Sequence, residues 1–169
     1  MFRRVVIPIA LIVVMGMTAS CSMISSWFGS DDPAKPTSVS VFDVAVGDCF
    51  TAPKDVAAEL SNLSKVPCSV DHQQELYATV DYTPPSTTTA AAQPGDSYPG
   101  DAVLDTYAQG ACAEAFTGYI GIAYPDSGLW MTYLLPSARS WQSGEDRQIL
   151  CFVTTTGSPL TKSVKGSKL

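Results

Sequence analysis

Residues 101–121 read DAVLDTYAQGACAEAFTGYIG, and this stretch decides the fold. Its apolar residues recur at the period of an α-helix, about 3.6 residues, as the pairs Val103/Leu104, Tyr107/Ala108, Ala111/Cys112, Ala115/Phe116 and Tyr119/Ile120. Suitable capping residues at its start are Asp96, Ser97 and Asp101, and Gly118 and Gly121 mark its end. The pattern therefore predicts one main helix that presents Cys112 and Phe116 on its buried face.

Strands are predicted on both sides of this helix. Residues 74–82 (QELYATVDY) alternate, with Leu76, Ala78 and Val80 on one face. Residues 129–135 (LWMTYLL) and 148–154 (QILCFVT) are two further strands, and a loop over 136–146 would make them a hairpin. The predicted fold class is α+β, with a small antiparallel sheet packed on one main helix.

The segments upstream of residue 74 carry weaker signals. Residues 39–50 predict an extended entry, a turn at Gly47-Asp48 and a short strand, and residues 54–63 have weak helical or loop character.

The N-terminus predicts export. Arg3 and Arg4 precede an apolar run over residues 5–17, whose length of about 13 residues suits a signal peptide and falls short of the roughly 20 of a spanning helix. Thr18-Ala19-Ser20 then leads to Cys21, the layout of a signal cleaved before a cysteine that carries lipid. Because Thr18 stands where a lipobox usually has Leu, an uncleaved anchor and cleavage without lipid remain as alternatives.

These features divide the chain into parts. We expect a signal peptide (1–20), a flexible lipid-anchored linker (21–40), a folded domain (41–155) and a disordered tail (156–169). Within the domain, residues 83–100 are low in complexity and predict a mobile loop. The expected location is the extracytoplasmic face of the cell membrane.

The charge of the chain excludes one class of partner. The net charge is −6, and removal of residues 1–20 would take away Arg3 and Arg4 and make it −8. No Lys or Arg lies between Lys65 and Arg139. Such a surface repels a phosphate backbone, so nucleic acid is not an expected partner.

Four further cysteines, Cys49, Cys68, Cys112 and Cys151, indicate two disulfides in an exported chain, with three connectivities open. A metal site is the weaker alternative, because the chain has no Cys-x-x-Cys motif and His72 is its single histidine. No metal and no cofactor are expected.

Several short motifs occur together in this chain. The first half holds GDCF (47–50), VPC (66–68), His72 and ELYA (75–78); the second holds YPG (98–100), the helix with Cys112, then Pro136, Trp141, Gly144, Arg147 and Cys151. Over residues 46–153 this set resembles the actinobacterial septum-formation domain family. The resemblance implies an exported, anchored protein linked to septum formation, in a family whose molecular activity is poorly defined.

Sequence proximity and this resemblance together favour the pairs Cys49–Cys68 and Cys112–Cys151. The second pair would pin the last strand to the main helix. On the chain-entropy account each disulfide stabilises the fold by roughly 3–4 kcal/mol.

Four side chains are candidates for binding: His72, Glu75, Trp141 and Arg147. His72 has carboxylates nearby, as a general base would, but no activated nucleophile accompanies it, so no catalytic residue is assigned. Its alternatives are a hydrogen bond within a loop and a contact with a ligand. Trp141 and Arg147 are expected to stack as a cation–π pair, either as a staple of the fold or as a platform for a glycan or peptide.

The sequence therefore predicts a non-enzymatic binding or scaffold module of the cell envelope. Its expected partners are membrane lipid, through Cys21, and envelope or division proteins or cell-wall glycan. One alternative is a ligand-binding or sensor lipoprotein for a cell-wall fragment or small molecule. A less favoured alternative is a cell-wall hydrolase.

Overall fold

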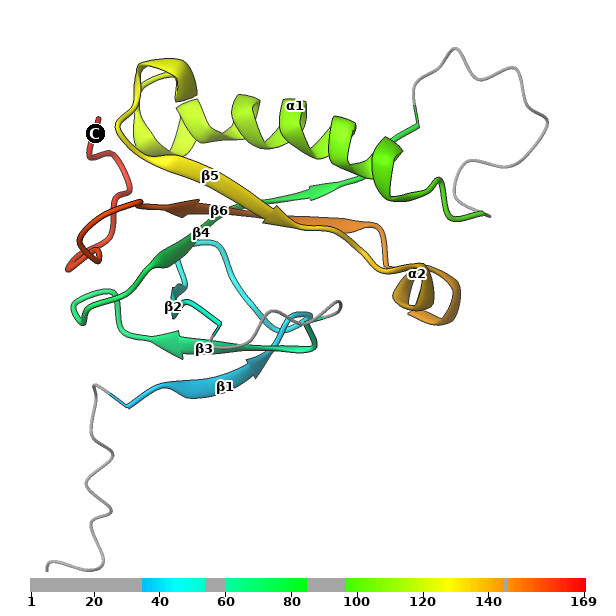
Figure 1. Cartoon of the computed structure of the whole chain (residues 1–169), viewed down its shortest axis with the longest axis horizontal. Coiled ribbons are helices and arrows are strands. Elements are labelled where there is room, and N and C mark those ends of the chain that lie inside the picture. The colour runs from blue at the N-terminus through cyan, green and yellow to red at the C-terminus, as the bar shows by residue number, and fades with distance from the viewer. Residues whose placement is uncertain (1–34, 54–59, 85–96, 145) are drawn as a thin grey trace, which may run out of the picture. The chain divides into compact units, whose positions relative to one another are not determined.

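A computed structural model of the chain describes residues 35–53, 60–84, 97–144 and 146–169 (Figure 1). The expected signal peptide, Cys21 and most of the linker lie outside these residues, as does most of the expected mobile loop. The elements are β1 (Thr37–Ser40), β2 (Cys49–Thr51), β3 (Asn62–Val66), β4 (Gln74–Asp81), α1 (Asp101–Ile120), the 3₁₀-helix η1 (Tyr124–Asp126), β5 (Trp130–Leu134), α2 (Ala138–Gly144) and β6 (Gln148–Thr154).

The described strands form one antiparallel sheet in the order β1-β3-β2-β4-β6-β5. Helix α1 packs against β4, β5 and β6, and Figure 1 shows β1 and β3 on the other side of these strands. The predicted α+β class is confirmed, as are the strand at 148–154 and the hairpin that it forms with β5.

Helix α1 buries the face that its periodicity predicts, including Leu104, Cys112 and Phe116. It ends at Gly121, whose left-handed backbone (φ 94°) suits glycine. Its N-cap is Gly100, without a side-chain capping bond, so the expected capping by Ser97 or Asp101 is wrong. Among the described residues, no helix is both long and apolar enough to cross a bilayer.

Strand β4 departs from simple alternation because it contains a β-bulge. Leu76 pairs with Phe152 and Ala78 pairs with Cys151, which leaves Tyr77 as the extra residue. The bulge turns Leu76 away from the face that Ala78 and Val80 share, so the expected common face is wrong. It also lets Glu75, Tyr77 and Ala78 lie on the face that α1 covers.

The sheet has a buried core on each face. The helix-side core contains Tyr77, Phe116, Tyr119 and Ile149 together with buried neighbours from α1, β6 and the C-terminal residues. The inner core contains Phe50, Leu63, Leu76, Leu150 and Phe152, with Val39 and Leu134 packed against it. Because all six described strands contribute to the inner core, the sheet must curl around it.

The segment between β5 and β6 is helical, where a loop was expected. Helix α2 follows Pro136, and the Ser137 hydroxyl accepts a hydrogen bond from the Ser140 N–H at 3.0 Å. This is an N-cap interaction, whose Ser-x-x-Ser signal is short and easily missed. In residues 54–63, the described part also differs from expectation, since Asn62 and Leu63 begin β3.

The C-terminal residues differ most from expectation. A disordered tail was expected from residue 156, but Leu160 and Val164 are buried. Leu160 and His72 exchange two backbone hydrogen bonds, of 2.9 and 2.8 Å. We call residues 160–168 the C-terminal strap. Its Gly, Ser and Lys content predicts disorder, but Leu160 and Val164 anchor it to the core.

The strap also completes the end of α1. The N–H of Gly166 donates to the Tyr119 carbonyl, and the N–H of Lys168 donates to the Ile120 carbonyl. The last carbonyls of a helix have no partner within it, so these bonds satisfy two groups that would otherwise need water.

Candidate functional site

The two expected disulfides, Cys49–Cys68 and Cys112–Cys151, are present, with Cα–Cα distances of 5.2 and 5.6 Å. The first joins the start of β2 to the turn after β3. The second joins α1 to β6 through the helix-side core. All four cysteines of the described domain are therefore paired.

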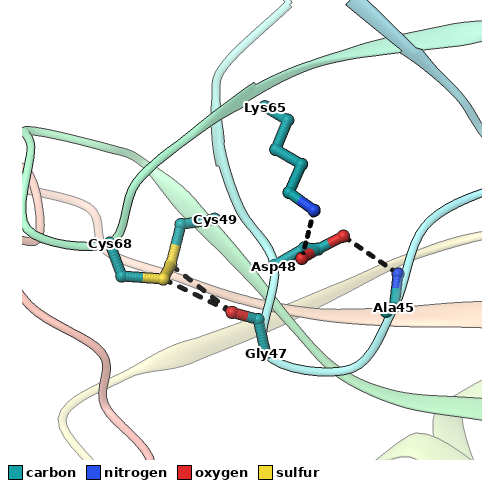
Figure 2. A network of polar contacts seen from close by, with 6 residues as sticks. All are labelled: Ala45, Gly47, Asp48, Cys49, Lys65 and Cys68. Atoms are coloured by element: carbon teal, nitrogen blue, oxygen red, sulfur yellow. Dashed lines mark hydrogen bonds and ion pairs between the residues drawn. A yellow bond between two sulfur atoms is a disulfide. The ribbon is translucent and has the colours of Figure 1, made fainter. Parts of the chain in front are cut away.

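The GDCF motif builds the turn that leads into β2 (Figure 2). Gly47 has a φ of 99°, which side-chain-bearing residues rarely adopt, and its N–H donates to the Leu76 carbonyl. Asp48 accepts a hydrogen bond from the Ala45 N–H at 3.0 Å and pairs with Lys65 at 2.6 Å. The Gly47 carbonyl oxygen lies 3.3 Å from Cys68 Sγ. The motif is thus explained by the fold.

His72 is completely buried, with 0% of its surface exposed. Its Nδ1 lies 2.7 Å from the Val70 carbonyl oxygen, and since a carbonyl only accepts, Nδ1 carries a proton. Its Nε2 has no hydrogen-bond partner among the described residues. His72 therefore stabilises a turn and, through its backbone, the strap.

Glu75 is equally buried, at 0% exposure, and three donors surround its carboxylate. Oε1 accepts from the Tyr119 hydroxyl at 2.5 Å and from the Ser163 hydroxyl at 2.6 Å, while Oε2 accepts from the Val164 N–H at 2.9 Å. Burial, and then the hydrogen bond to this carboxylate, raise the pKa of Tyr119 well above its usual value of 10.0. Glu75 therefore fastens the strap to β4.

This buried cluster has the residue types of a metal site, because ligand atoms of Cys49, His72 and Glu75 lie within 4.8 Å of one another. The disulfide, however, removes the thiolate that a metal would require from Cys49. The Glu75 oxygens are already engaged by the three donors. In the oxidised protein the cluster fits a structural role.

Trp141 and Arg147 stack as expected, with the guanidinium carbon 3.8 Å from the indole centroid. Arg147 also donates to the Trp141 carbonyl at 2.9 Å. Trp141 is buried against the rings of Tyr82 and Tyr98, so its face does not form an open platform. The structure thus places His72 close to Glu75, and Trp141 against Arg147. The first pair contacts the strap and the second contacts Tyr82 and Tyr98, so the four residues do not form one site.

A cleft that the sequence did not indicate opens beside the inner core, with a volume of about 550 Å³. We call it the edge cleft. Its apolar lining includes Val41, Phe42, Leu60, Leu134 and Leu150, and its carboxylates are Asp101 and Asp146. These residues come from separate segments that only the curled sheet brings together. Among these residues, Phe42 is a large apolar side chain with 66% of its surface exposed.

A family model described as Septum formation matches residues 46–167. The match begins just before the GDCF turn, includes both disulfides and extends through most of the strap, beyond the limit of residue 153 expected from the motifs. No curated protein and no solved structure matches the chain.

Proposed function

The chain belongs to the septum-formation family, which links it to cell division or the cell envelope, and we propose that it acts there as a non-enzymatic binding or scaffold module. We further propose that lipid on Cys21 holds it at the extracytoplasmic face of the membrane. The expected export signal over residues 1–20 and the cysteine that follows it support this address.

The edge cleft is the observation that carries the binding function. It combines exposed apolar surface with a few polar groups, and its volume of about 550 Å³ lies within the range of about 300–1,000 Å³ that is usual for ligand sites. Phe42, a large apolar side chain at 66% exposure, stands in its lining. A partner that covered this surface would gain the free energy of burying it.

The buried cluster supports a binding role over a hydrolytic one. A general base must come within hydrogen-bond reach of its substrate. His72 is 0% exposed and its Nδ1 is committed to the Val70 carbonyl, while Glu75 holds the strap. His72 and Glu75 are thus engaged in the fold and are not presented to a substrate.

The alternative of a ligand-binding or sensor lipoprotein rests on the same cleft. A cell-wall fragment would place its polar groups against Asp101 and Asp146 and its apolar groups against the lining. Addition of purified muropeptides, followed by amide hydrogen exchange, tests this alternative. Slower amide exchange in β5 and at the β1–β3 end of the cleft would favour the ligand-binding alternative, and unchanged exchange there would contradict it.

Depletion of the protein in its native cells tests the proposed function. We expect misplaced or delayed septa, seen by microscopy with a fluorescent label for new cell wall. Complementation with the unchanged gene is the control. Normal septum placement and wall synthesis after complete depletion would contradict the division role.

A further inference from the structure

Two strands of the described sheet are paired on one side only. β1 pairs with β3 and β5 pairs with β6, and these two strands end the sheet order. No described segment pairs with the outer edge of either strand. An unpaired edge presents a row of backbone donors and acceptors, which is a template for a further strand.

The edge cleft lies at the ends of these two strands. Val41 and Phe42 follow β1 directly, and Leu134 is the last residue of β5. Val41, Leu134 and Leu150 also belong to, or pack against, the inner core. A side chain that entered the cleft from an added strand would therefore extend the inner core.

The charges around the cleft are complementary to a basic segment. Asp101 and Asp146 line it, and its described lining contains no Lys, Arg or His. The nearby cations are Arg147, which is stacked on Trp141, and Arg139 on α2, which is exposed. The net charge of the whole chain is −6.

We propose that the edge cleft binds an extended segment of a partner protein, which adds as a strand to the outer edge of β5. Alternate apolar side chains of this segment enter the cleft, and a lysine or arginine lies beside Asp101 or Asp146. This inference rests on the proposed binding function and names the chemistry of its partner. Backbone hydrogen bonds supply the affinity, and the cleft supplies the specificity.

Two synthetic peptides test the proposal on the full-length protein purified from membranes. One alternates lysine and valine and the other alternates glutamate and valine, and both are acetylated, amidated and labelled with a fluorophore. We expect the basic peptide to bind at least about tenfold more tightly in anisotropy titrations, because like charges oppose the acidic one. Bound peptide should also slow amide hydrogen exchange in β5.

Matched variants locate the binding. Phe42→Ala removes an exposed ring from the cleft and should weaken binding of the basic peptide at least about tenfold, because the apolar side chains of the peptide lose this surface. Val46→Ala changes another exposed apolar residue, outside the described lining, and should leave affinity unchanged. Asp101→Asn should weaken binding about two- to fivefold, the usual range of an exposed ion pair, against no change for Asp126→Asn.

Four results would overturn the proposal: no binding of the basic peptide, equal affinity for both peptides, an affinity unchanged by Phe42→Ala, or a dimer of the free protein in analytical ultracentrifugation that Phe42→Ala dissociates, which would place a second copy in the cleft. Experiments in cells distinguish a failure of the cleft inference from a failure of the proposed function. If depletion disturbs septa and Phe42→Ala restores them fully, the cleft inference fails while the proposed function stands. If depletion has no effect although the peptide binds, the proposed function fails while the binding site stands.

Discussion

Glu75 shows what a carboxyl side chain must gain to be buried inside a protein. A buried carboxylate is costly unless hydrogen bonds replace its water. The Tyr119 hydroxyl, the Ser163 hydroxyl and the Val164 N–H supply those bonds. The three donors come from α1 and the strap, so one side chain ties both to β4. The place of Glu75 in the ELYA motif of this sequence therefore has a structural explanation.

We predict that Glu75→Gln lowers the free energy of unfolding by about 2–4 kcal/mol, because the new amide NH₂ would face groups that donate. Urea unfolding at neutral pH measures the change. Glu114→Gln, on an exposed part of α1, is the control and should change stability by less than about 0.5 kcal/mol. Equal effects of the two substitutions would contradict the role of Glu75.

The raised pKa of Tyr119 predicts how the free energy of unfolding changes at alkaline pH. Its pKa is raised in the folded protein, first by burial and then by the bond to Glu75, and the pKa of buried Tyr77 is raised as well. The folded state thus holds these protons more tightly than the unfolded state. Their contribution is fully present below about pH 10 and is lost as the pH rises from there through the folded-state pKa.

Chemical unfolding from pH 8 to 11.5 checks this dependence. We expect the unfolding free energy to fall above about pH 10, and Tyr119→Phe should make that fall shallower while lowering stability at pH 8 by about 1 kcal/mol. An equally steep decline in the Tyr119→Phe variant would show that Tyr119 does not control it.

At the scale of elements, the strap decides how α1 ends and how β4 is covered. Leu160 and Val164 of the strap pack into the helix-side core, and N–H groups of the strap donate hydrogen bonds to the last carbonyls of α1. These interactions make it an element of the domain, which agrees with the family match reaching residue 167.

Leu160→Ala tests the strap. Leu160 is 8% exposed, so the truncation should lower stability by about 2–4 kcal/mol, as for other buried leucines. Leu169→Ala is the matched control, since Leu169 is 53% exposed and should tolerate the change. If Leu160→Ala is also neutral, residues 160–168 do not pack as described.

The two disulfides differ in what they connect: Cys112–Cys151 joins α1 to β6, whereas Cys49–Cys68 joins β2 to the turn that follows its neighbour β3. Cys112–Cys151 spans a separation of 39 residues and Cys49–Cys68 spans 19. Replacing either pair by alanine should cost about 3–4 kcal/mol on the chain-entropy account. Because the cost rises by about 0.6 kcal/mol per doubling of the loop, removal of Cys112–Cys151 should be the more damaging change in thermal unfolding. A larger loss for the Cys49–Cys68 pair would contradict this ranking.

At the scale of the whole molecule, we predict that Cys21 decides location without affecting the stability of the domain. The four other cysteines are paired with one another, so Cys21 is available for lipid. Intact mass of the membrane-purified protein should show cleavage before Cys21, an added acyl mass and the loss of two hydrogens per disulfide. Cys21→Ser should move the protein out of the membrane fraction and leave its unfolding temperature unchanged. An unmodified, uncleaved chain in membranes would contradict the lipid anchor.

Much of the fold could be predicted because its signals are local. The buried face of α1, the strand at 148–154 and the hairpin follow from periodicity, and the disulfide pairs from cysteine count, proximity and family resemblance. Helix α2 also had a local signal, the Ser137 cap, but one too short to stand out. His72 and Glu75 were recognised as neighbours, although their complete burial was not.

Local periodicity and composition thus determine helix α1, the strands β4, β5 and β6, the expected export of the chain, its acidic charge and the number of disulfides, because each depends on residues close in sequence. The bulge at Tyr77, the packed strap, the Glu75 network and the edge cleft were decided only by tertiary structure. Each joins segments distant along the chain, and their contacts exist only once the sheet has curled and α1 has packed on it. Leu160, for example, is held by backbone hydrogen bonds to His72, and no local pattern at either residue predicts that pairing.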